Sequence, residues 1–170
     1  MEVPLILTLA IEENASQFFN ALRKIYFPAE RFYIDAHLTL FHLLPNDPLI
    51  VDTIASVSKE REILLLHVKE PAFIDNKVVF KIESEGLTQL HYRLQQQWQP
   101  FLIPEDRELL WPHITIQNKI TPEAAEELLQ FLIENFSSFH TIGTGLQLWE
   151  YDGGPWKLFS EFNFVKNEAK

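Results

Sequence analysis

The sequence predicts an α+β fold of two similar lobes, each with an antiparallel-rich sheet and flanking helices, related by a pseudo-twofold axis and separated by a cleft. Strand-like and helix-like segments alternate, without a Gly/Ser linker or a low-complexity stretch. A weak internal repeat is present, because a strand that carries His-x-Thr twice leads into a helix that begins at a proline. The 170 residues can enclose a sizeable core, so we expect one domain over residues 1–170.

The first half of the chain is expected to form two strand–helix units. In order these are a buried strand over 3–11, a helix over 14–26, a His-x-Thr strand over about 33–44 and a helix that begins at Pro48. Asn14 is a plausible cap of the first helix, and Pro28 follows its end. Asp47 before Pro48 is typical of a helix start.

The second half repeats this order with additional strands. Its expected elements are strands over 62–69 and 77–83, a helix over 86–99, a His-x-Thr strand over 112–118, a helix from Thr121-Pro122 and a final hairpin. The hairpin turns at Gly153-Gly154-Pro155, between two segments of alternating apolar residues.

Composition excludes several classes of function. The formal net charge of −10 argues against an extended nucleic-acid surface, but a local cationic pocket for a small anion stays open. Without cysteine there is no disulfide, thiolate ligand or cysteine nucleophile, and five glycines form no phosphate-binding loop. No apolar run is long enough to span a membrane, and the start lacks a basic leader. We therefore expect a cytoplasmic monomer without a cofactor.

The two His-x-Thr segments place an imidazole and a hydroxyl on one face of a strand. Side chains alternate along a strand, so His37 and Thr39 share a face, as do His113 and Thr115. The aliphatic residues between them point to the opposite face, which anchors each strand in a core. If two lobes bring these faces together, the cleft holds two imidazoles and two hydroxyls.

Such a cleft suits phosphodiester chemistry without a metal. A neutral imidazole can deprotonate an attacking water or hydroxyl, and a protonated one can give a proton to the departing oxygen. Threonine hydroxyls can donate hydrogen bonds to the non-bridging phosphate oxygens, where charge develops. No metal site is expected, because no carboxylate stands at ligand spacing from the histidines.

The segments "AHLTLFHLLP" and "WPHITIQNKI" resemble the motifs of the two-histidine (2H) phosphoesterase superfamily, of the RNA ligase-like and 2',3'-cyclic phosphodiesterase type. The resemblance covers most of the chain and implies that His37 and His113 act as acid and base, while Thr39 and Thr115 bind the phosphate. Two departures stand out. His42 and the residues after it replace a glycine that many relatives have, and Gln117-Asn118 replaces a basic residue. The phosphate pocket is therefore expected to be less cationic than usual.

Aromatic rings near the motifs are candidates for stacking on a nucleobase. Phe41 and Tyr33 share the strand phase of His37, and Trp111 shares that of His113. Further rings stand on the terminal hairpin, namely Trp149, Tyr151 and Trp156. His42 has the opposite phase from His37, so we expect it on the core side.

The leading hypothesis is a metal-independent phosphoesterase that opens a cyclic phosphodiester, the nucleoside or RNA-terminal 2',3'-cyclic phosphate. Its substrate is a small nucleotide or an RNA end. Two alternatives use the same cleft: binding of phosphorylated nucleotides or RNA ends without turnover, and 2'-5' RNA end joining, in which a 5'-hydroxyl attacks in place of water.

Overall fold

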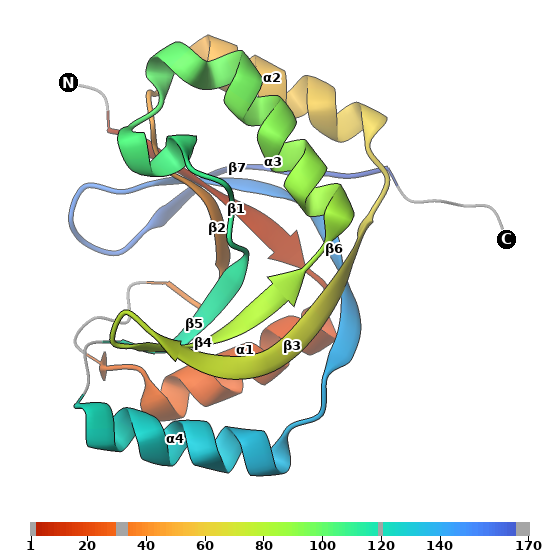
Figure 1. Cartoon of the computed structure of the whole chain (residues 1–170). Helices are drawn as coiled ribbons and strands as arrows, with labels where there is room; N and C mark the ends of the chain where they lie inside the picture. Colours follow the sequence, from red (N-terminus) through yellow and green to blue (C-terminus); the bar gives the residue numbers. More distant parts are fainter. Residues whose placement is uncertain (1–2, 30–33, 119–120, 166–170) are drawn as a thin grey trace, which may run out of the picture.

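A computed structural model describes residues 3–29, 34–118 and 121–165 (Figure 1). It has an α+β fold, as the sequence predicts, with four α-helices around a curved sheet over the described residues. The strands are β1 (Leu5–Ile11), β2 (Leu38–Leu44), β3 (Leu64–Ile74), β4 (Lys77–Glu83), β5 (His113–Asn118), β6 (Phe139–Glu150) and β7 (Lys157–Asn163). The helices are α1 (Glu13–Tyr26), α2 (Pro48–Glu60), α3 (Glu85–Trp98) and α4 (Pro122–Asn135), with short 3-10 turns η2 (Gln99–Phe101) and η3 (Pro104–Arg107).

The seven strands form one antiparallel sheet in the order β2-β1-β6-β3-β4-β5, and β7 also pairs with β6. The long strand β6 joins the two halves of this sheet. Its first part pairs with β3 from Phe139 to Gly143, and its later part pairs with β1 as far as Glu150. The two motif strands, β2 and β5, are the ends of the main path of the sheet.

The helices cover the sheet in two pairs. Helices α2 and α3 lie together above one half of the sheet, and α1 and α4 lie together below the other half (Figure 1). Helix α1 follows β1 in sequence but packs on β5, so it links the two halves. None of the helices over the described part of the chain is long and apolar enough to cross a membrane.

Helix starts follow the capping residues in the sequence, with one exception. The side chain of Asp47 accepts a hydrogen bond from the backbone N–H of Leu49, and that of Thr121 caps α4 in the same way. The expected cap at Asn14 is wrong, because α1 starts one residue before it and Glu12 occupies the cap position, where its side chain accepts no hydrogen bond from the helix N–H groups.

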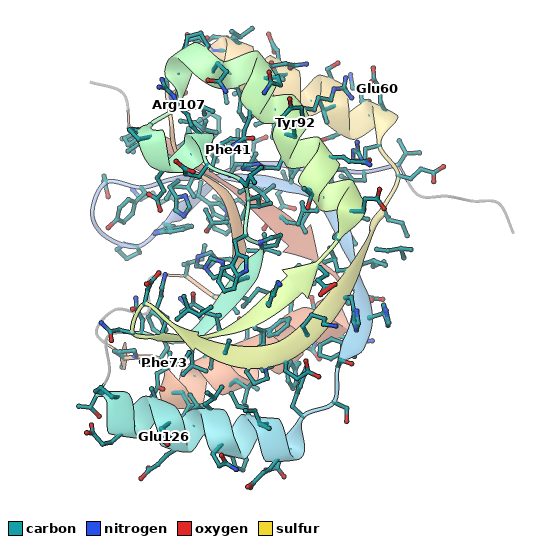
Figure 2. The ribbon with its side chains drawn as sticks, viewed as in Figure 1. Phe41, Glu60, Phe73, Tyr92, Arg107 and Glu126 are labelled. Atoms are coloured by element: carbon teal, nitrogen blue, oxygen red, sulfur yellow. The ribbon has the colours of Figure 1, made fainter. Side chains whose placement is uncertain are left out.

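One contiguous core of aliphatic and aromatic side chains lies between the sheet and the helices. Trp98, Phe19 and Phe80 are among its largest fully buried members. Figure 2 shows Phe41 inside the molecule beneath α3, whereas Tyr92 and Glu126 lie on outer helix faces.

Strand β3 is longer than the sequence predicts. The expected strand ended at residue 69, but β3 continues to Ile74. A register shift between Val68 and Pro71 accommodates the proline, which has no N–H to donate to a ladder. The two-residue turn to β4 is formed by Asp75 and Asn76, both at positive φ, 51° and 62°.

Candidate active site

The two motif histidines are held in the same way. His37 directly precedes β2, and His113 is the first residue of β5. Nδ1 of His37 lies 2.9 Å from the carbonyl oxygen of Asp35, and Nδ1 of His113 lies 2.8 Å from that of Trp111. A carbonyl can only accept, so each Nδ1 carries a proton and donates it. In the neutral rings, Nε2 is therefore the basic nitrogen.

Both motif strands contain a bulge at the equivalent position. In the β1–β2 pair the register shifts between Thr39 and Phe41, so that Leu40 is the extra residue, and it shifts again between Phe41 and Leu44. In the β4–β5 pair it shifts between Thr115 and Gln117, with Ile116 as the extra residue. A bulge of this kind reverses the alternation of side chains after it.

The bulges decide which residues reach the cavity. Phe41 and Gln117, four residues after the motif histidines, are both buried. The next residues, His42 and Asn118, face the same cavity as the motifs. The expectation that His42 lies on the core side is therefore wrong, because the period of two does not continue through the bulge.

The four motif side chains meet in one cavity of about 280 Å³. His37, Thr39, His113 and Thr115 all line it, which joins residues from opposite ends of the sheet path. The other lining residues are Arg23, Phe27, Ile34, His42, Lys77, Asn118 and Trp156. No carboxylate lines this cavity among the residues that the structure describes, whereas three cationic or titratable side chains besides the motif histidines do.

Arg23 of α1 connects the two motifs. Its Nη1 donates to the carbonyl oxygen of Thr115 at 2.8 Å, and its Nη2 donates to that of Ile34 at 3.3 Å. The side chain is buried, and this burial lowers its pKa to about 10, against the opposing effect of Asp35. The guanidinium therefore stays protonated at neutral pH and adds positive charge to the cavity.

Burial and neighbouring positive charge act on both motif imidazoles. Burial of the ring is the main cause that lowers the pKa of His37 to about 4, and nearby Arg23, His113 and His42 add to it. Burial also lowers the pKa of His113, with contributions from Lys77 and His42. In the free protein both rings are thus mostly neutral at pH 7.

His42 has the opposite character. Its Nδ1 lies 2.9 Å from Oδ1 of Asp106, a carboxylate of η3 that is almost completely buried. This hydrogen bond is the main cause that raises the pKa of His42. The same carboxylate accepts hydrogen bonds from the backbone N–H groups of His42 and Leu43.

The predicted stacking residues do not reach the cavity as expected. Phe41 is 0% exposed and stacks on His91 in the core, so the prediction for it is wrong. Trp111 is at the surface with its ring 4.8 Å from that of His113, but it is not part of the cavity lining. Tyr33 lies outside the described residues. Trp156 and Phe27 do line the cavity, and the ring centroid of Trp156 is 4.8 Å from that of His37.

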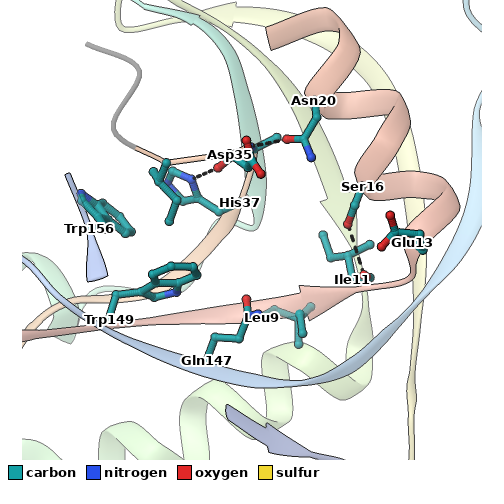
Figure 3. Close-up of a pocket in the computed structure, with 13 residues that line it drawn as sticks. Leu9, Ile11, Glu13, Ser16, Asn20, Asp35, His37, Gln147, Trp149 and Trp156 are labelled. Carbon is teal, nitrogen blue, oxygen red and sulfur yellow. Dashed lines mark hydrogen bonds between the residues drawn. The ribbon is translucent and has the colours of Figure 1, made fainter. Parts of the chain in front are cut away.

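A second cavity of about 550 Å³ adjoins the first. Ile34, His37 and Trp156 line both. In Figure 3 the rings of His37, Trp149 and Trp156 gather at one end of this second cavity, and Ser16 and Asn20 project from α1 at the other. Trp149 is fixed by a hydrogen bond of 2.9 Å from its Nε1 to the hydroxyl of Thr8.

Sequence reasoning missed Arg23, Lys77 and Asp106. Each stands alone in its own segment, without a repeated spacing that links it to a motif. The position of His42 was missed because it depends on the bulge, which is visible only in the pairing of β1 with β2. Among the described residues, no group of three or more His, Asp or Glu side chains is arranged to hold a metal ion.

Comparison with known proteins gives consistent results. The family model described as the 2'-5' RNA ligase superfamily matches residues 11–155. The crystal structure of TT0787 of Thermus thermophilus superposes with a TM-score of 0.68 at 15% identity, over 95% of this chain and 97% of that one. The crystal structure of E. coli LigT complexed with NADP+ gives a TM-score of 0.58 at 15% identity, over 95% and 98%. A protein described as a phosphoesterase gives 0.59 at 14% identity, over 97% and 99%. Among curated protein sequences, none matches the chain.

Proposed function

The chain belongs to the 2'-5' RNA ligase superfamily, and on this premise we propose that it is a phosphoesterase that opens the 2',3'-cyclic phosphate of a nucleoside or an RNA end. The observation that carries the proposal is the equivalent placement of His37 and His113. Each ring donates its Nδ1–H to the carbonyl two residues earlier, and each lines one shared cavity beside a threonine.

The reaction needs one neutral and one protonated imidazole. Nε2 of the neutral ring accepts a proton from a water molecule, whose oxygen attacks phosphorus. The bond from phosphorus to the 2'- or 3'-oxygen breaks, and the protonated ring gives its proton to that oxygen. The products are a phosphomonoester and a free hydroxyl. The lower pKa of His37, about 4, favours it as the base and leaves His113 as the acid.

The remaining cavity residues suit the charge that develops on phosphorus. The hydroxyls of Thr39 and Thr115 would donate hydrogen bonds to the non-bridging oxygens. The cations at Arg23 and Lys77 would stabilise the same negative charge. Such donors are effective because the protein holds them in place before the substrate arrives.

The second cavity is suited to the nucleoside of the substrate. It shares His37 and Trp156 with the phosphate cavity, so a ligand can extend from one to the other. The indole of Trp156 offers a face for stacking on a base, and Gln147 and Asn20 offer polar groups. Its lining includes the carboxylates of Glu13 and Asp35, which disfavours a second phosphate there.

The test is an assay with a panel of nucleoside 2',3'-cyclic phosphates, with and without EDTA. We expect hydrolysis that EDTA leaves unchanged, and we expect His37→Ala and His113→Ala each to lower kcat by about 10²–10⁴ while the fold is kept. The exposed His140, on β6, provides the matched control His140→Ala, which keeps full activity.

Two results would contradict the proposal. Unchanged turnover in both motif variants would exclude two-histidine catalysis. Tight binding of the phosphomonoester product, with no cleavage of any cyclic phosphate, would support a binding protein instead.

A further inference from the structure

We propose that His42, held by the buried carboxylate of Asp106, is the residue that supplies the switchable positive charge for binding the substrate phosphate. The inference rests on the proposed function, because it assigns a further residue to the same cavity. It gives a role to a histidine outside the two His-x-Thr motifs and to a carboxylate on a distant 3-10 turn.

The first support is position. The bulge at Leu40 turns His42 into the cavity that holds both motif histidines and both threonines. The equivalent residue after the second motif is Asn118, which lines the same cavity without charge. One of the two symmetric positions is therefore neutral, and the other can carry a positive charge.

The second support is the way the ring is held. Asp106 is almost fully buried and accepts three hydrogen bonds from this segment: one from the ring of His42 and others from the backbone N–H groups of His42 and Leu43. Nδ1 is directed at the carboxylate of Asp106, so a ligand can reach the ring only at Nε2, where it competes with the exposed carboxylate of Glu105. The ring is about half exposed, so a ligand in the cavity can reach it.

The third support is the balance of charge around the ring. Asp106 and Glu105 of η3 favour the protonated ring, and Nε2 lies 3.7 Å from Oε1 of Glu105. Lys77 of β4 opposes it, and the rings of His37, His91 and His113 lie close enough for their charges to interact with that of His42. The hydrogen bond to Asp106 is the largest of these effects, so the pKa of His42 is raised.

These observations explain how the cavity can bind a phosphate although no basic residue directly follows the second motif. Residues 117 and 118 provide no cation after the second motif. His42 supplies one from the first motif, and its imidazolium can donate a charge-assisted hydrogen bond to a phosphate oxygen.

Sulfate binding measured by calorimetry from about pH 6 to about pH 9 tests the inference, because the charge of sulfate is constant over this range. The raised pKa means that the ring of His42 is protonated below it and neutral above it. We therefore expect wild-type affinity to fall as the pH rises through the pKa of His42, which an NMR titration of the ring resonances reports independently.

Three variants separate charge from structure. His42→Asn keeps a donor to Asp106 but removes the charge, so sulfate should bind about tenfold more weakly at pH 6 and with a smaller pH dependence, which the ring of His113 still supplies. His42→Arg keeps the charge at every pH and should bind sulfate with little change from pH 6 to pH 9. Asp106→Asn should move the midpoint of the pH dependence to lower pH.

His140→Asn is the matched control and should behave like the wild type. Wild-type sulfate affinity and pH dependence in His42→Asn would overturn the inference, even if cyclic phosphates are hydrolysed. Absence of hydrolysis in the wild type, with sulfate binding that still depends on His42, would instead reject the proposed function and keep the phosphate site.

Discussion

As individual residues, the two motif histidines share a hydrogen-bond pattern but not an environment. His37 packs against Trp156 and lies near Arg23, whereas His113 packs against Trp111 and lies near Lys77. Burial lowers the pKa of both rings, and at His37 the value reaches about 4. The lowered values set the pH range in which one ring can be neutral while the other is protonated.

This difference predicts an acidic pH optimum. Activity rises with pH as the base loses its proton and falls with pH as the acid loses its own, so kcat/KM peaks midway between the two pKa values. Both pKa values lie below the ordinary 6.5, at about 4 for His37, so the maximum of kcat/KM should fall below pH 6.5. The phosphate of a cyclic diester does not titrate in this range, so it adds no step to the profile. A maximum above pH 7 would contradict the prediction.

The same residues show what the sequence can and cannot predict about the site. The pairs His37/Thr39 and His113/Thr115 are predictable because a period of two places each pair on one face. Phe41 and His42 are not, because a bulge is a property of strand pairing and leaves no mark on the alternation itself. Arg23 is also not predictable, because its two acceptors are backbone carbonyls, which every residue has.

Among the secondary-structure elements, the β6–β7 hairpin positions Trp149 and Trp156, the two indole rings that line the cavities. The strands pair from Gly145 and Asn163 to Glu150 and Lys157, and Trp156 directly precedes β7. The sequence predicts this hairpin from its glycine-rich turn. The contact of Gly145 with the neighbouring strand is visible only in three dimensions. A Cβ at Gly145 would lie 2.5 Å from the backbone carbonyl oxygen of Phe162.

Gly145→Ala is therefore expected to force β7 away from β6. The backbone of β7 has to move, so we expect a loss of about 1–3 kcal/mol in the free energy of unfolding in urea. The displaced hairpin should also move Trp156 and raise KM for a cyclic phosphate.

In contrast, a Cβ at Gly154 would meet nothing within 4 Å. Gly154→Ala, in the same hairpin, should stay within about 0.5 kcal/mol of the wild type. Equal stability of the two variants would disprove this role for Gly145.

Across the protein as a whole, charge is distributed unevenly. The formal net charge is −10, but the cavity between the motifs is lined by Arg23, Lys77 and His42 and by no carboxylate among the described residues. A local positive region in an acidic protein attracts a small anion and disfavours a long polyanion on the surrounding surface. This distribution favours a small nucleotide or a single RNA end over extended RNA.

The halves of the molecule are joined at the site by α1. Arg23 donates to the carbonyl oxygen of Thr115 in the second motif and to that of Ile34 just before the first. A single buried guanidinium thus links the two motifs, whose strands are at opposite ends of the sheet path. Lysine cannot replace it, because one ammonium group does not have the fork geometry that spans two carbonyls.

Arg23→Met should therefore reduce both stability and catalysis. Two partly buried carbonyls lose a donor, which should cost about 2–3 kcal/mol in urea unfolding. The motifs lose their fixed spacing, so kcat for a cyclic phosphate should fall by about 10². Arg23→Lys keeps the charge and should recover part of the stability but little of kcat.

Arg107→Met is the control, because Arg107 is exposed and donates to the nearby carbonyl oxygen of Gln99, at 3.3 Å. Wild-type kcat in Arg23→Lys would show that the charge of Arg23, and not its bridge between the motifs, is what the site requires.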